Sequence, residues 1–105
     1  MNFRLMGRCG SLLLAAGLST GAAHAQSPAD FYKGKTVTIY VGLSAGGGYD
    51  TNARLVGRHL GKYIPGNPTV IVQNQPGAGS LSMTNQLYAL GPKDGTAIGV
   101  PISTS

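Results

Sequence analysis

The sequence TVTIYVGLSAGGGYD, residues 36–50, decides the fold. Its first part, Thr36–Val41, alternates polar and apolar residues and is rich in β-branched side chains, which predicts a strand. Glycines crowd the turn that follows, up to Asp50. From Thr51 to about Ile64, apolar residues then recur at helical spacing, at Ala53, Val56, Leu60 and Ile64. The stretch therefore predicts a strand that enters a helix through a glycine-rich loop.

A second strand and helix follow the first pair. Thr69–Val72 is predicted to be a strand, and Asn74–Gly79 closes it with another glycine-rich turn. Ser80 can cap a helix that runs to about Leu90, with Met83, Leu87 and Leu90 on one side. A third short strand is predicted at Ala97–Val100. The βαβαβ order, with about 30 residues in each unit, predicts an α/β protein with a parallel sheet.

The two glycine-rich loops, Ala45–Asp50 and Pro76–Ser80, are expected at the same edge of this sheet. Both follow a strand and precede a helix, and right-handed crossovers place alternate loops on opposite edges. That edge is the carboxyl edge, where open α/β sheets bind ligands. The sequence therefore predicts a site that both loops build together.

Each loop allows two interpretations. Alone, a run such as Gly46-Gly47-Gly48 is most often a tight turn in which glycine supplies positive φ. Two such loops at one edge instead favour an anionic ligand, because exposed N–H groups and two helix dipoles add positive potential. Tyr49 is as well suited to wall a ligand as to pack on the sheet edge. Asp50 opens the helix, so N-capping is its expected role, and orienting a ligand amine is a minor alternative.

The spacing of residues in the two loops decides whether the expected anion is a carboxylate or a nucleotide. A P-loop needs a lysine after its glycines, and none follows either loop. A dinucleotide fingerprint needs a third glycine where Thr51 stands, and an acidic residue at the end of the second strand, where Gln73 and Asn74 stand. A carboxylate is therefore the expected ligand.

Charge and residue types argue against nucleic-acid binding and catalysis. The 105 residues carry eight Lys or Arg and three Asp, a net charge of +5. Arg4 and Arg8 lie at the N-terminus, and the other basic residues are scattered without a nucleic-acid motif. His59 is expected to be solvated, and the sequence offers no paired carboxylates, histidine cluster or Ser-His-Asp set. We expect a protein that is not an enzyme, binds no nucleic acid and needs no metal or cofactor.

The first 25 residues predict a cleavable signal peptide. Arg4 and Arg8 form a positive region, Ser11–Leu18 a short apolar core, and Ala23-His24-Ala25 a cleavage site. The mature chain is expected to begin at Gln26 and to reside in the periplasm. Cys9 leaves with the signal, so the mature chain has no cysteine for a disulfide, a metal site or a nucleophile.

Several motifs together resemble the opening of one protein family. They are VGLSAGGGYD at residues 41–50, ARL at 53–55, VIVQNQPGAGS at 70–80 and PKDGT at 92–96. In this order they resemble the Bug family, the TctC-type extracytoplasmic receptors of tripartite tricarboxylate transporters. The resemblance covers residues 31–105. It implies a type II periplasmic-binding-protein fold of two lobes, a carboxylate-bearing small molecule as ligand, and a two-subunit membrane permease as partner.

The resemblance also implies which residues bind the ligand. The backbone of the two loops would hold one carboxylate, with Ser103 and Thr104 reaching the same cleft; the loop residues are Gly46, Gly47, Gly48, Tyr49, Gly77, Ala78, Gly79 and Ser80. Tyr49 and Ser80 stand where Thr and Gly are commoner in the family. These two changes alter the cleft wall and leave open which carboxylate is bound.

The resemblance further implies that residues 26–105 are the N-terminal part of the first lobe, an incomplete βαβαβ portion of the fold. On its own this portion is expected to show no saturable carboxylate binding, because one lobe supplies too few hydrogen bonds to offset the entropy lost on association. Two alternatives stay open. One is an exported enzyme for an anionic substrate, with its catalytic part beyond Ser105, and the other is a truncated, non-functional remnant of a receptor.

Overall fold

The structure is a computed structural model that describes residues 26–103. Its elements are α1 (Pro28–Tyr32), β1 (Thr36–Val41), α2 (Gly48–Tyr63), β2 (Thr69–Asn74), the 3-10 turn η1 (Ala78–Ser80), α3 (Leu81–Leu90) and β3 (Ala97–Val100). The predicted α/β class and βαβαβ order are therefore confirmed. The predicted signal peptide, its cleavage site and Thr104 lie outside the described residues.

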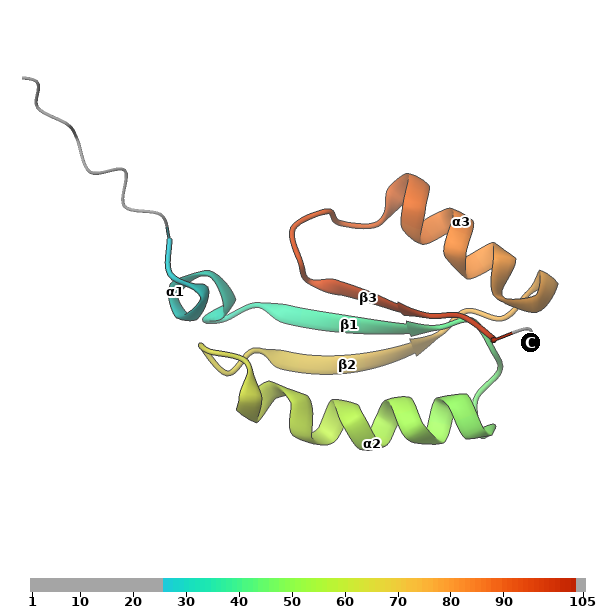
Figure 1. Ribbon diagram of the computed structural model, residues 1–105, viewed down its shortest axis with the longest axis horizontal. Helices are drawn as coiled ribbons and strands as arrows, with labels where there is room; N and C mark the ends of the chain where they lie inside the picture. Colours follow the sequence, from blue (N-terminus) through green and yellow to red (C-terminus); the bar gives the residue numbers. More distant parts are fainter. Residues whose placement is uncertain (1–25, 104–105) are drawn as a thin grey trace, which may run out of the picture.

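The three strands form one parallel sheet in the order β2-β1-β3. Thr36 pairs with Thr69 at the start of β1, and Val41 lies between Asn74 and Val100 at its end. Helix α2 packs on β1 and β2, whereas α3 lies on the opposite face and contacts β3 (Figure 1). The result is a helix–sheet–helix arrangement with β1 in the middle. In the described range, no helix has the length and apolar character that crossing a membrane requires.

The core lies along β1 because its alternate residues face α2. Val37, Ile39 and Val41 are buried, and Ile39 and Val41 form a cluster with Ala53 of α2. Helix α2 approaches β2 closely where it carries glycine: a Cβ on Gly61 would lie 2.6 Å from the carbonyl oxygen of Pro68. Any side chain there would force the helix away from the sheet.

The structure corrects several predicted details in the helices and in β2. Helix α2 begins at Gly48, three residues before Thr51, because the extended backbone of Gly47 ends the loop there. Strand β2 continues to Asn74, and the N–H of Gln75 still donates to Val41. Leu90, predicted on the packed side of α3 with Met83, is 79% exposed.

Helix α1 was not predicted from the sequence. It has five residues, too few to show helical periodicity, although it carries a local start signal. Ser27 is its N-cap and accepts a hydrogen bond from the N–H of Asp30 at 3.1 Å, and Pro28 occupies the first turn.

Candidate functional site

The two glycine-rich loops lie at the carboxyl edge of the sheet, as predicted. Strands β1 and β2 run parallel and end side by side, with Val41 opposite Asn74. In Figure 1 both arrows point to the end of the molecule where α2 and α3 begin. Each loop therefore delivers the N-terminus of a helix to one edge, and N-terminal N–H groups favour an anion there.

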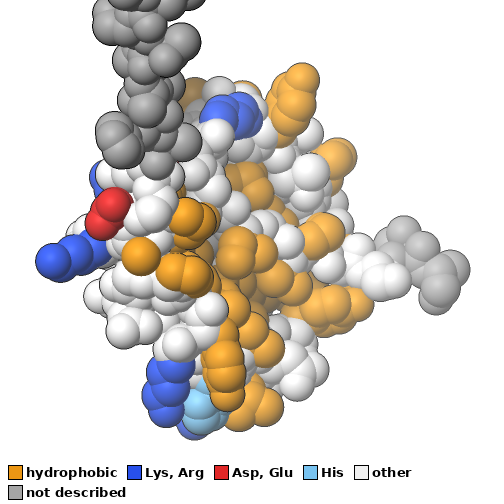
Figure 2. Space-filling model, turned by 60° about the vertical axis from the view of Figure 1, so that its left-hand side comes forward, with side chains coloured by type: hydrophobic (Ala, Val, Ile, Leu, Met, Phe, Trp, Pro, Cys, Tyr) orange, Lys and Arg blue, Asp and Glu red, His pale blue; other side chains and the backbone are white. Residues whose placement is uncertain are grey.

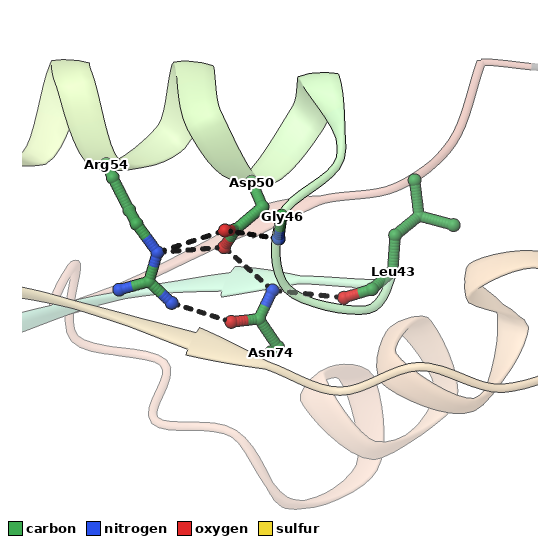
Figure 3. Close-up of polar contacts among 5 residues, drawn as sticks. All are labelled: Leu43, Gly46, Asp50, Arg54 and Asn74. Atoms are coloured by element: carbon green, nitrogen blue, oxygen red, sulfur yellow. Dashed lines mark hydrogen bonds and ion pairs between the residues drawn. The ribbon is translucent and has the colours of Figure 1, made fainter.

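Asp50 organises the first loop (Figure 3). Its side chain is buried, and it accepts a hydrogen bond from the N–H of Gly46 at 2.9 Å. It also accepts one from Nε of Arg54 at 3.1 Å and one from Nδ2 of Asn74 at 2.8 Å. These donors, the Gly46 N–H foremost, lower the pKa of Asp50 from 3.8 to about 2. The carboxylate is therefore charged at neutral pH and fully occupied with internal partners.

The expectation that Asp50 caps α2 is wrong. Gly47 is the N-cap, and Asp50 is the third residue of the helix. Its carboxylate reaches back to the loop, so it fixes the loop's shape while leaving the first turn of the helix uncapped by any side chain. In the described range, no hydrogen bond uses the N–H of Gly48 or Tyr49. These two N–H groups can therefore donate to a ligand.

Asn74 joins the first loop to the end of β2. Its Nδ2 donates both to Asp50 and to the carbonyl oxygen of Leu43 at 3.1 Å, and its Oδ1 accepts from Arg54 at 2.8 Å. The loop is thus tied to the neighbouring strand by charge-assisted bonds, the stronger kind. Asn74 was predicted to lie in a turn, and no role was predicted for Arg54, although the Asp50–Arg54 spacing of four residues is that of a helical ion pair.

The second loop has a left-handed backbone over four consecutive residues. The φ angles are 139° at Gly77, 49° at Ala78, 59° at Gly79 and 72° at Ser80. Glycine adopts such angles freely, but each non-glycine residue costs about 1–2 kcal/mol in this region. Contacts of Ser80 with the rest of the fold must therefore hold the loop. No hydrogen bond within residues 26–103 uses the N–H of Ala78 or Gly79.

Ser80 supplies those contacts. Its side chain is buried; the hydroxyl donates to the carbonyl oxygen of Gly42 at 3.1 Å and accepts from the N–H of Ile102 at 2.9 Å. Ser80 is the N-cap residue of α3 by position, as predicted, but its side chain makes no capping hydrogen bond there and instead clamps the second loop. Gly42 is needed for this approach, since a Cβ there would lie 2.4 Å from the Ser80 hydroxyl oxygen.

The segment after β3 contacts both loops. Ile102 bonds to Ser80 of the second loop, and the N–H of Ser103 donates to the Tyr49 hydroxyl at 3.0 Å in the first. The Tyr49 ring packs against the core cluster around Ile39, which favours packing on the sheet edge over walling a ligand. Three chain segments that are distant in sequence thus meet at one edge.

The edge has the chemistry of an anion-binding backbone site. Its available donors are N–H groups near two helix N-termini, and its one carboxylate, Asp50, is neutralised by Arg54. Within the part of the chain that the structure describes, no cluster of His, Cys, Asp or Glu could hold a metal ion. His59 lies exposed along α2, away from the loops, as expected.

Comparison with known proteins gives one informative relative. No protein-family model matches the chain, and no solved structure matches it. A curated protein of Cupriavidus necator, described as "UPF0065 protein in gbd 5'region", is 32% identical over 85 residues, which are 81% of this chain. The chain spans 25% of the length of that relative.

Proposed function

We propose that this chain belongs to a Bug/TctC-type solute-binding receptor and binds the carboxylate of a small molecule with its two glycine-rich loops. UPF0065, the name carried by the C. necator relative, is used for Bug/TctC-like proteins. The likeness extends over 81% of this chain, and the motifs of the two loops resemble the same family. Because the chain spans 25% of that relative, the proposal treats these residues as one part of a larger receptor.

The observation that carries the proposal is the meeting of both loops and the Ile102–Ser103 segment at one sheet edge. A carboxylate there would accept hydrogen bonds from Gly48 and Tyr49 on one side and from Ala78 and Gly79 on the other. The internal clamps, Asp50 in the first loop and Ser80 in the second, would hold these donors in place before the ligand arrives. Such preorganisation lowers the entropic cost of binding.

Energetics support a site that is completed by further protein. Charge-assisted hydrogen bonds contribute about 1.5–3 kcal/mol each. Association costs about 4–15 kcal/mol, whereas micromolar affinity needs about 8 kcal/mol net. A few bonds from one sheet edge fall short of that value. We therefore propose that a second lobe closes over the carboxylate, and that the receptor works in the periplasm and delivers its ligand to a membrane permease.

The titratable side chains near this edge favour binding over catalysis. Asp50 is held in its charged form by three donors, so it is a poor proton acceptor at neutral pH. His59 is exposed on α2, away from the loops. The site therefore supports recognition of a carboxylate by backbone N–H groups.

A calorimetric titration tests this function. The protein, purified at its natural length from the cells that make it, is titrated with tricarboxylates, dicarboxylates, acidic amino acids and aromatic acids. We expect saturable binding of at least one acid and loss of binding when its carboxylate is replaced by the amide. Equal binding of acid and amide would contradict carboxylate recognition, and absence of binding to every class would contradict the receptor function.

A further inference from the structure

Strand β2 leaves one edge of the sheet open within residues 26–103. The N–H of Thr69 donates to the carbonyl oxygen of Lys35, just before β1, and the N–H of Gln75, just after β2, donates to that of Val41. The backbone N–H and C=O groups of the odd-numbered residues of β2 therefore point toward β1. In a parallel ladder the N–H and C=O of the alternate residues, Val70 and Val72, then point away from the sheet. The strand, TVIVQN, carries no charge and no proline, the usual devices that protect an edge from pairing with another chain.

A row of basic side chains lies beside this edge. Arg54, Arg58 and Lys62 are spaced by four residues on α2 and therefore share one side of the helix. Arg58 and Lys62 line a shallow groove with Val70, and Arg54 and Arg58 line its continuation toward Val72. Figure 2 shows basic side chains gathered beside a histidine at the α2 side of the molecule. The groove between helix and strand is thus both polar and positively charged.

Two of the three cations in the basic row form no ion pair in the described range. Arg54 pairs with Asp50, and no acidic side chain in the described range pairs with Arg58 or Lys62. Both side chains are exposed. Gly57 and Gly61, on the inner side of α2, let the helix lie close to β2, which keeps the two cations near the open edge.

The spacing of these cations matches an added strand. Four residues of helix rise about 6 Å, the distance from Arg58 to Lys62 along the axis. Two residues of a strand advance about 6.6 Å, the distance between side chains on one face. A strand paired with β2 could therefore place an acidic residue at every second position against this row.

We propose that the β2 edge and the basic row of α2 form a docking site for an extended acidic segment of a partner protein, bound as a fourth strand. Backbone groups of Val70 and Val72 would form the ladder, and Arg58 and Lys62 would select for acidic residues at alternate positions. An anionic lipid or a nucleic acid could meet the charge, but neither has the peptide groups that the open edge requires. This site lies along β2 and adjoins the first glycine loop at Arg54, whose guanidinium is already held by Asp50 and Asn74.

Fluorescence anisotropy with a labelled peptide tests the proposal. The probe is a short peptide in which Glu and Thr alternate, and its control has the same composition with all Glu residues together. We expect tighter binding of the alternating peptide. Two further probes carry backbone N-methyl groups at every second residue, one at the odd positions and one at the even positions. One of them should lose binding and the other should keep it, because only alternate N–H groups of the added strand bond to β2. Equal binding of both methylated peptides would overturn strand addition.

Charge variants complete the test. Arg58→Ala and Lys62→Ala should each weaken binding about two- to fivefold, the effect of losing one exposed ion pair. Lys93→Ala removes the same charge at the end of α3, on the opposite face of the sheet, and should leave affinity unchanged. An equal loss in all three variants, or tighter binding to nucleic acid or anionic vesicles than to the alternating peptide, would contradict the assignment.

Discussion

Substituting Gly48 by proline would remove one proposed ligand contact without disturbing the fold. Gly48 is the first residue of α2, a position where proline is favoured because the N–H has no helical partner. The preceding residue, Gly47, has φ −80° and ψ 176°, which is the extended conformation that a following proline requires. A Cβ at position 48 meets no atom within 4 Å.

The size of the effect follows from the hydrogen bond that is lost. An N–H that donates to a carboxylate contributes about 1.5–3 kcal/mol, so affinity should fall about 10- to 150-fold. The free energy of unfolding should rise, because proline restricts the unfolded chain and adds about 0.4–1 kcal/mol of stability at a compatible site. Weaker binding together with unchanged or higher stability is the signature of a lost donor.

Each variant, made at the protein's natural length, is titrated calorimetrically with the carboxylate ligand, and its stability is measured by urea unfolding. Gly48→Ala is the matched control, since it adds a side chain but keeps the N–H. We expect Gly48→Pro to bind far more weakly than Gly48→Ala. Equal affinity of the two variants would refute a ligand contact through this N–H.

The internal clamps make three further predictions. Gly42→Ala should lose about 1–3 kcal/mol of stability in urea unfolding, because its Cβ would collide with the Ser80 hydroxyl; Gly47→Ala, whose Cβ meets nothing, should change little. Ser80→Ala should cost about 1–3 kcal/mol by leaving Gly42 and Ile102 without their partner, and an unchanged melting temperature would contradict the clamp. The lowered pKa of Asp50 adds stability that is complete above about pH 4 and disappears as pH falls through about 2; unfolding measured across this range should show a flatter acid dependence in Asp50→Asn, and identical curves would contradict it.

The sequence predicted the elements whose residues alternate or recur regularly. Thr36–Val41 and Ala97–Val100 are strands with the bounds that the pattern indicated. The placement of both glycine loops at one edge also followed, because crossover handedness depends only on the order of strands and helices. The prediction that Leu90 packs on the same side as Met83 was wrong. The helical spacing continues to the last residue of α3, but Leu90 is 79% exposed.

The internal clamps could not be predicted, because they depend on tertiary register. Asn74 reaches Asp50 and Leu43 only because β1 and β2 end side by side. A local pattern cannot show this, so Asp50 was assigned the commonest role of an acidic residue at a helix start. Ser80 has a local capping signal as well, but its left-handed backbone turns the hydroxyl to Gly42.

Amide NMR of the labelled protein at its natural length, titrated with the carboxylate that calorimetry identifies, tests the central claim most directly. If both loops hold one carboxylate, the N–H signals of Gly48, Tyr49, Ala78 and Gly79 should shift together and give a single dissociation constant. The signal of Gly46, whose N–H is held by Asp50, should move less. Saturable binding that shifts amides elsewhere and leaves both loops unchanged would contradict the account.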